Sequence, residues 1–165
     1  MGQSVICMSL CLLLLVLGHS MVTAKVKPDI GILTDSSPPK IYVFPMANIV
    51  VNESTEIPFS STIYNPGAVD YDPVDEKIYF TDDGSDNGGT DYIGKVKADG
   101  TEFEQIISIT DPRGLALDVE ERKLFFTNAA GGVYCASLDG TGVKNIVDID
   151  DGFGADSIVV DRLRR

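Results

Sequence analysis

The sequence predicts an all-β protein made of repeated four-stranded antiparallel sheets, and three observations support this prediction. An aromatic strand occurs twice, as KIYFTDDG at Lys77–Gly84 and as KLFFTNAA at Lys123–Ala130. The apolar residues come in short segments rich in Ile, Leu, Tyr, Phe and Thr, which favour strands. After residue 24, no segment shows the apolar spacing of a helix of useful length.

The two aromatic strands belong to a longer repeat with a period in the mid-forties. Residues 67–82 align with residues 114–128, which makes Asp118 the equivalent of Asp70. The lysines that begin the two aromatic strands lie slightly closer together than these aspartates do, and we assign the difference to the turn that contains Pro73. A repeat of this length, with its length changes in loops, is typical of stacked supersecondary units.

Each copy of the repeat predicts four strands in order. The first strands are Gly67–Tyr71 and Gly114–Val119, the second Lys77–Thr81 and Lys123–Thr127, the third Tyr92–Lys97 and Val133–Leu138, and the fourth Glu104–Ile109 and Lys144–Ile149. The third strand leads into Asp-Gly, which favours a tight hairpin whose two central residues both take positive φ. Four short strands per repeat of this length describe one blade of a β-propeller.

The repeat continues in both directions but stays incomplete. Residues 30–44 predict a second and a third strand, since Thr34-Asp35 precedes Thr81-Asp82 by about one period, and Glu56–Ser60 predicts a fourth. Residues 157–165 repeat the first strand. The blade pieces are therefore about 30–60, 67–109, 114–149 and 157–165, with three, four, four and one predicted strands.

The aromatic motif resembles the YWTD repeat, which is the class B repeat of the low-density lipoprotein receptor family. Tyr79-Phe80-Thr81-Asp82 and Phe125-Phe126-Thr127-Asn128 stand at the naming motif, and Asp-Gly-Thr turns follow each copy. Phe80 and Phe126 replace the usual Trp, and Asn128 replaces Asp. The resemblance covers about Ile30–Arg165. It implies a six-bladed propeller of an extracellular receptor or matrix protein, Wnt co-receptor-like proteins among them, which binds protein ligands on one face and has no enzymatic activity.

We assign structural roles to the motif residues. The large side chains of Tyr79, Phe80, Phe125 and Phe126 are expected to fill the faces on which neighbouring blades pack. Thr and Asp or Asn end each strand with short acceptors, which we expect to bind backbone N–H groups that have no partner in the sheet.

Twelve predicted strands make about half of a six-bladed propeller, which needs about 24 strands and roughly 250–270 residues. An open arc would leave apolar flanks in water, at ~1.5–3 kcal/mol for each large side chain. The chain is therefore expected to be a fragment of a longer receptor, to close a ring with a second copy, or to be poorly stable. Because residues 157–165 stop before an expected aromatic strand, we favour the fragment.

The amino terminus predicts a secretory signal peptide at residues 1–24. Val5–Gly18 is an apolar run, and Val22 and Ala24 stand where a signal peptidase reads small residues. The run is too short to span a bilayer, which takes ~18–20 residues. We therefore expect residues 25–165 to be secreted or to lie at the extracellular face of the plasma membrane, without a transmembrane helix. Asn52 begins a glycosylation sequon.

Composition narrows the function. The net charge is −12, which disfavours nucleic acid and favours an extracellular protein partner with a basic patch. The predicted mature chain has no histidine for general base catalysis, so we expect no enzyme. We also expect no cofactor and no metal, although the lack of histidine would still allow a metal site built from Asp and Asn. Two alternatives stay open: a calcium-dependent propeller hydrolase of lactonase or esterase type, and a truncated gene product without a function of its own. Cys135 is expected at a half-buried strand position, although an exposed thiol or an intermolecular disulfide would also fit.

The loop TDDGSDNGGTD at residues 81–91 is the candidate ligand contact, with Asp83, Asp86 and Asp91 as the binding residues. Loops on a rigid scaffold carry function, and their negative charge suits a partner rich in Lys or Arg. The loop also resembles the start of a calcium-binding loop, but Gly94 stands where a bidentate Glu is needed. We therefore predict a protein contact rather than a calcium site.

Overall fold

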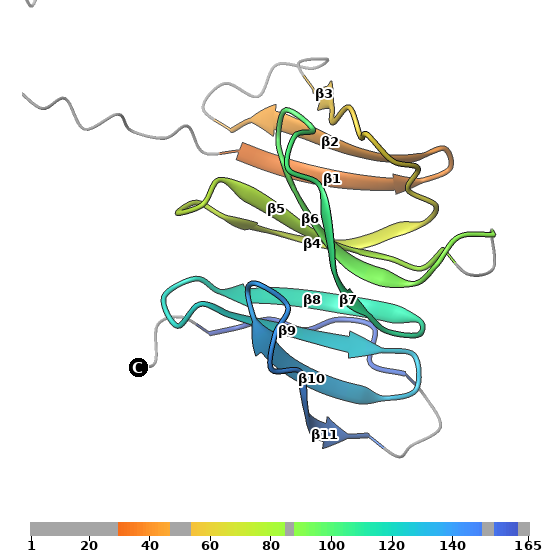
Figure 1. Ribbon diagram of the computed structural model, residues 1–165, viewed down its shortest axis with the longest axis vertical. Coiled ribbons are helices and arrows are strands. Elements are labelled where there is room, and N and C mark those ends of the chain that lie inside the picture. Colours follow the sequence, from red (N-terminus) through yellow and green to blue (C-terminus); the bar gives the residue numbers. More distant parts are fainter. Residues whose placement is uncertain (1–29, 47–53, 85–87, 150–153, 162–165) are drawn as a thin grey trace, which may run out of the picture.

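The computed structural model describes residues 30–46, 54–84, 88–149 and 154–161, and every regular element within them is a β-strand. Three antiparallel sheets are stacked on one another (Figure 1). They are β1-β2-β3, β4-β5-β6-β7 and β8-β9-β10-β11. The predicted all-β fold with four-stranded antiparallel units is confirmed.

The strand bounds agree closely with the prediction in the two complete sheets. The strands are β1 Ile30–Ser36, β2 Pro39–Pro45, β3 Thr55–Glu56, β4 Pro66–Asp72, β5 Lys77–Asp82, β6 Tyr92–Lys97, β7 Glu104–Ser108, β8 Pro112–Asp118, β9 Lys123–Asn128, β10 Gly132–Ser137 and β11 Lys144–Asp148. The predicted strand at Glu56–Ser60 is wrong in extent, since β3 ends at Glu56. Ile57 still donates to Ile41 O at 2.9 Å, but Pro58 has no N–H with which to continue the ladder.

Several sequence predictions fall outside the described residues. These are the signal peptide at 1–24, the sequon at Asn52, loop residue Asp86, and the end of the last blade piece at 162–165. Residues 157–161, the described part of that piece, were predicted to form a first strand, but they pair with no strand among the described residues. They run beside β8 instead (Figure 1), where Gly114 lies against Ser157 and Ile158.

The register shows that the repeat keeps a constant spacing from β4 to β9. Asp72 pairs with Lys77 in the second sheet, and Asp118 pairs with Lys123 in the third. Asp118 is therefore the equivalent of Asp72 rather than of Asp70, and the predicted length difference in the turn at Pro73 is wrong. In the sequence, Asp118 could be aligned with either aspartate of Asp70-Tyr71-Asp72.

The predicted geometry of the Asp-Gly hairpins is also wrong in one respect. Gly100 and Gly140 have positive φ, at 80° and 87°, but the aspartates before them do not. Each glycine donates to the carbonyl three residues earlier, and Asp99 Oδ1 accepts from both the N–H and the hydroxyl of Thr101. These bonds lower the pKa of Asp99. The aspartate therefore caps the turn and leaves the left-handed position to glycine alone.

Two apolar layers fill the spaces between the sheets. The layer between the first and second sheets centres on Phe80, which is fully buried against Phe59, Tyr92 and Phe103. The layer between the second and third sheets contains buried Tyr79 from one side and Phe126 from the other. Alternate residues of β5 thus serve both layers, as the period of two in a strand requires.

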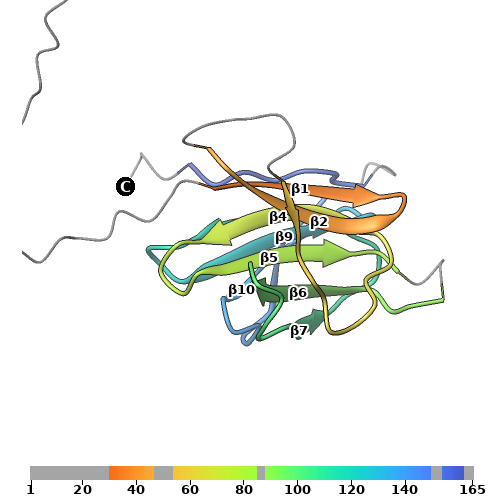
Figure 2. The ribbon, with the colours of Figure 1, turned by 90° about the horizontal axis from the view of Figure 1, so that it is seen from above.

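The threonine of each aromatic strand joins its own sheet to the next one. Thr81 Oγ1 accepts from Ala68 N at 2.9 Å in its own sheet and lies 3.3 Å from Arg113 O, to which it donates, in the following sheet. Thr127 repeats this arrangement: it accepts from Gly114 N and donates to Ala155 O at 2.5 Å. Thr34 donates forward to Gly67 O at 2.7 Å. β1, β4 and β8 therefore lie side by side along one margin of the stack (Figure 2).

Candidate protein-binding surface

Three aspartates converge at the end of the stack where the aromatic strands finish. Asp83 follows β5, Asp91 precedes β6, and Asp111 precedes β8. Carboxylate oxygens from all three lie within 4.8 Å of one another, and each residue is half-buried. The structure thus brings together two of the predicted contact residues, Asp83 and Asp91, and adds Asp111, which the sequence prediction missed.

Backbone bonds hold these aspartates in place. Asp83 N donates to Asn65 O at 3.1 Å, and Asp111 N donates to Asp91 Oδ2 at 3.1 Å. Asp111 takes a positive φ of 48° just before Pro112, where the chain turns into the first strand of the third sheet. The repeat could have indicated Asp111 only by its equivalence to Asn65 in the preceding copy, because nothing in its own neighbourhood marks a binding residue.

The acidic cluster borders a shallow hollow between the second and third sheets. The hollow has a volume of about 330 Å³ and is lined by Asn65, Gly67, Ala68, Asp83, Pro112, Arg113 and Asp156. The Arg113 guanidinium lies 3.9 Å from Asp83 and is 42% exposed, so it neutralises the cluster only in part. The described residues at this end of the stack form a predominantly negative rim.

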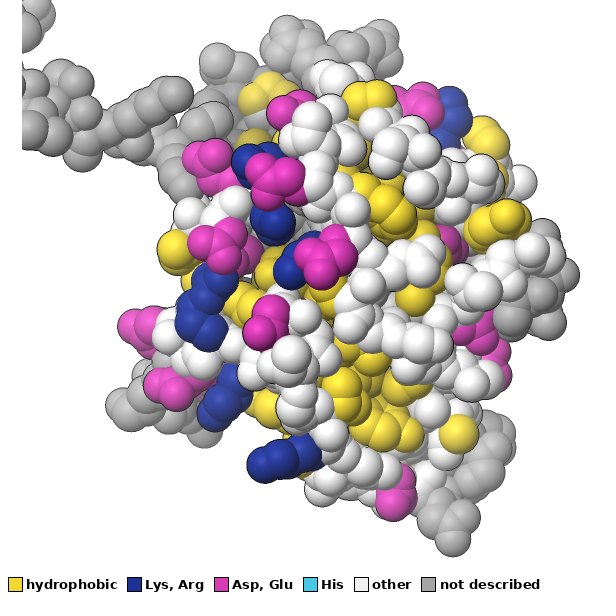
Figure 3. Space-filling view, viewed as in Figure 1, with side chains coloured by type: hydrophobic (Ala, Val, Ile, Leu, Met, Phe, Trp, Pro, Cys, Tyr) yellow, Lys and Arg dark blue, Asp and Glu magenta, His cyan; other side chains and the backbone are white. Residues whose placement is uncertain are grey.

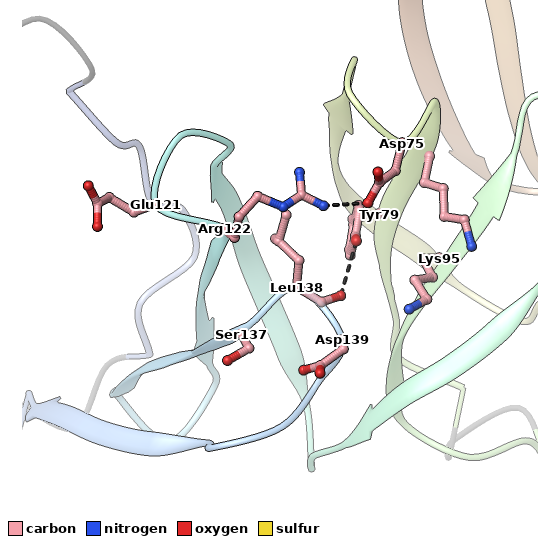
Figure 4. A pocket seen from close by; sticks show the side chains of 9 residues that line it. Asp75, Tyr79, Lys95, Glu121, Arg122, Ser137, Leu138 and Asp139 are labelled. Atoms are coloured by element: carbon pink, nitrogen blue, oxygen red, sulfur yellow. Dashed lines mark hydrogen bonds and ion pairs between the residues drawn. The ribbon is translucent and has the colours of Figure 1, made fainter.

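The opposite end of the stack has a different electrostatic character. A hollow of about 380 Å³ there is lined by Asp75, Lys77, Tyr79, Lys95, Glu121, Arg122, Ser137, Leu138 and Asp139 (Figure 4). Arg122 pairs across the sheets with Asp75 and with buried Asp72, and Lys95 pairs with Glu104 at 3.1 Å. In the space-filling view, basic and acidic side chains alternate along this margin, on the left (Figure 3). The Arg122 pairs join the second and third sheets, and the pairing of charges leaves little net field for a ligand.

Tyr79 closes the floor of this second hollow. Its hydroxyl donates to Leu138 O at 3.0 Å, and the side chain is 2% exposed (Figure 4). Burial, with the nearby charge of Asp72 as a smaller cause, raises the pKa of Tyr79 to about 12. Burial also raises the pKa of Tyr92.

The raised pKa values of Tyr79 and Tyr92 predict that the protein loses stability at alkaline pH. An unfolded tyrosine ionises near pH 10, so the stabilisation by Tyr79 is complete below pH 10 and is lost as the pH rises toward 12. We expect the urea midpoint to fall across this window, and to fall less in Tyr79→Phe than in a Tyr42→Phe control. Parallel pH curves for the two variants would contradict this prediction.

The other predicted motif residues lie as follows. Tyr79, Phe80 and Phe126 are buried between sheets, whereas Phe125 is only half-buried on the outer face of the third sheet. Asp82 accepts from the backbone N–H groups of Tyr64 and Asn65.

Asn128, at the position equivalent to Asp82, accepts from Gly132 N at 2.9 Å. Cys135 lies half-buried on β10 with a free thiol. Among the described residues, no helix has the length and apolarity that crossing a membrane requires.

Comparisons with known proteins give the fold. No family model matches the chain, and a search of curated proteins finds no match. Among solved structures, a nidogen/laminin complex matches with a TM-score of 0.61 at 23% identity, over 73% of this chain and 44% of that one. A gluconolactonase from Xanthomonas campestris matches with a TM-score of 0.58 at 14% identity, over 80% of this chain and 52% of that one.

A putative TolB from Agrobacterium tumefaciens also matches, with a TM-score of 0.53 at 20% identity, over 79% of this chain and 49% of that one. The chain thus spans only about half of each of these structures. Because the sequence identity to each of them is low, they inform the fold and not the activity. The sheets described above and these matches together identify the chain as a partial β-propeller.

Proposed function

We propose that the chain is a non-catalytic, protein-binding segment of a YWTD-type propeller from a protein related to the low-density lipoprotein receptor family. The acidic rim of Asp83, Asp91 and Asp111 binds a basic patch on an extracellular protein. The proposal rests mainly on the convergence of three half-buried carboxylates at one end of the stack. Among the described residues that line the neighbouring hollow, Arg113 is the one basic side chain, and it is only weakly paired with Asp83.

The physical basis is electrostatic complementarity. Carboxylates held by backbone bonds lose little conformational entropy when a partner binds, and a net negative rim attracts Lys and Arg side chains and speeds their approach. The paired charges at the opposite end lack this property. A likeness to the propeller of a nidogen/laminin complex supports protein binding and suggests laminin as a first probe.

The YWTD assignment is supported by the roles of the motif residues. Aromatic side chains fill the layers between sheets, threonine joins each sheet to the next, and aspartate accepts backbone N–H groups at the strand end. Secretion through the signal peptide, placement at the cell surface and glycosylation at Asn52 belong to the same proposal, and they rest on the sequence.

Binding to a basic partner predicts a selective effect of charge removal. We expect the triple variant Asp83→Asn/Asp91→Asn/Asp111→Asn to bind laminin and immobilised poly-lysine about tenfold more weakly than wild type in biolayer interferometry. The control Asp75→Asn/Glu121→Gln/Asp139→Asn changes the net charge equally at the opposite end, and we expect it to bind within about threefold of wild type. Equal losses in both triples would show that net charge alone governs binding and would refute the acidic rim.

The structural similarity to a gluconolactonase is the observation that favours the alternative function, a calcium-dependent hydrolase. Hydrolysis of lactone esters that rises on addition of calcium and is lost in the triple Asn variant would replace protein binding by this enzymatic function. We propose that no such turnover occurs.

A further inference from the structure

Tyr64 lies across the neck of the acidic loop, the point where Gly84 and Gly89 meet at the base of the loop. Gly89 N donates to Gly84 O at 2.9 Å and closes the neck. A Cβ added at Gly89 would lie 2.4 Å from the Tyr64 ring, and a Cβ added at Gly84 would lie 3.0 Å from the Cβ of Tyr64. One half-buried side chain therefore packs on both arms of the loop.

The backbone of Tyr64 is fixed to the strand from which the loop starts. Tyr64 N donates to Asp82 Oδ2 at 3.0 Å, and Asn65 N donates to Asp82 Oδ1 at 2.6 Å. In return, Asp83 N donates to Asn65 O at 3.1 Å. Because these bonds hold the backbone of Tyr64, its ring contacts the neck from a fixed base.

The third sheet supplies an internal comparison for Tyr64. The equivalent backbone bond there joins Ala129 N to Asp111 O, so Thr110 takes the place of Tyr64. Thr110 is exposed, and the connection from β9 to β10 spans only residues 129–131. In these two sheets, an aromatic side chain thus accompanies the long loop, and a small polar one accompanies the short connection.

We propose that Tyr64 is a positioning residue for the acidic rim. Its ring holds the neck of the loop closed and thereby keeps Asp83 and Asp91, which flank the neck in the sequence, at a spacing that suits one basic side chain of the partner. Their carboxylate oxygens lie within 4.8 Å of each other. Carboxylates that already have this spacing lose less conformational entropy when they bind a cation. The effect on binding rests on the proposed function, whereas the hold on the neck does not.

Two neighbouring glycines allow the role of the ring to be isolated. Gly88 has a φ of 85°, and nothing lies within 4 Å of a Cβ added there. Alanine at position 88 is therefore opposed by its own backbone conformation. Gly89 lies outside the left-handed region, so alanine at position 89 is opposed by the Tyr64 ring instead.

Amide exchange in the full secreted chain tests the hold on the neck without a ligand. We expect the Gly89 N–H, followed by NMR, to exchange about tenfold faster in Tyr64→Ala than in wild type, because its bond to Gly84 O opens more often. Tyr64→Phe keeps the ring and should exchange within about threefold of wild type. Tyr42→Ala removes a half-buried tyrosine from the first sheet and should leave the exchange at Gly89 unchanged. An unchanged rate in Tyr64→Ala would overturn the proposal.

A double-mutant cycle assigns the effect to the ring. In the wild-type background, Gly89→Ala should speed exchange of the amide at position 89 about tenfold, but in the Tyr64→Ala background it should add less than about twofold, since the obstructing ring is gone. Gly88→Ala should have the same effect in both backgrounds. If Gly89→Ala also had equal effects in both, the ring would not control the neck.

Binding measurements separate this inference from the proposed function. In biolayer interferometry, we expect Tyr64→Ala to dissociate from immobilised poly-lysine and from laminin about fivefold faster than wild type, and Tyr64→Phe and Tyr42→Ala to match wild type. Faster exchange at Gly89 with unchanged dissociation would refute the positioning role. A wild-type chain that binds neither probe would refute the proposed function, and the exchange rates would still decide whether Tyr64 holds the neck.

Discussion

Replacement of Asp82 by alanine is expected to lower the free energy of unfolding by about 2–5 kcal/mol. Asp82 is fully buried, and its carboxylate accepts from Asn65 N at 2.6 Å and from Tyr64 N at 3.0 Å. Hydrogen bonds to a charged group contribute about 1.5–3 kcal/mol each, and alanine leaves both donors without a partner. The urea midpoint and the yield of secreted protein measure the effect.

Two variants make this expectation specific. Asp99→Ala also removes an aspartate that accepts backbone and side-chain bonds, but at an exposed turn, and should lower the urea midpoint far less than Asp82→Ala does. Asp82→Asn should lie between wild type and Asp82→Ala, since an amide oxygen can accept from one of the two backbone N–H groups but forms weaker bonds than a carboxylate. An Asp82→Ala midpoint equal to that of wild type would show that the carboxylate is not structural.

Replacement of Phe80 by alanine is expected to cost about 3–5 kcal/mol, a large share of the about 5–15 kcal/mol that stabilises a typical domain. The ring is 0% exposed and lies edge-on to Phe59 at 5.5 Å and to Tyr92 at 6.1 Å. The facing position is Gly94, where an added Cβ would lie 2.8 Å from the ring, so the site is closely packed. Removal of the ring therefore opens a cavity between two sheets.

Phe103 provides the matched control for this prediction. It packs against the same ring at 6.4 Å but is half-buried, so Phe103→Ala should cost less than half as much. Urea unfolding curves of the two variants give the comparison. If both substitutions cost the same, the layer between the first and second sheets does not depend on Phe80 as its centre.

The sequence was sufficient for the architecture because the repeat supplied the same information twice. Short apolar segments, each copy with a pair of adjacent aromatic residues, and the polar turns between them indicated strands β4–β11, and the recurrence of one pattern indicated stacked units. Details that depend on a single residue were less secure. Pro58 shortened β3, and the two acidic residues of DYD allowed a wrong alignment of Asp70, which only the pairing with Lys77 resolves.

The candidate surface was predictable only in part. Asp83 and Asp91 belong to a loop whose composition is conspicuous, but Asp111 reaches them from the next repeat through tertiary packing. The bonds of threonine to the following sheet were equally invisible, because they join a side chain to a backbone carbonyl with no sequence signature.

The constant spacing of the repeat ends at the acidic rim. Residues 83–91 connect β5 to β6, whereas residues 129–131 suffice to connect β9 to β10. In the second and third sheets the turns at the other end keep their lengths, and ion pairs such as Arg122–Asp72 join these sheets there. Within the two four-stranded sheets, length variation is thus confined to one rim. New recognition segments could arise there by insertion during evolution, while the framework beneath them keeps its geometry.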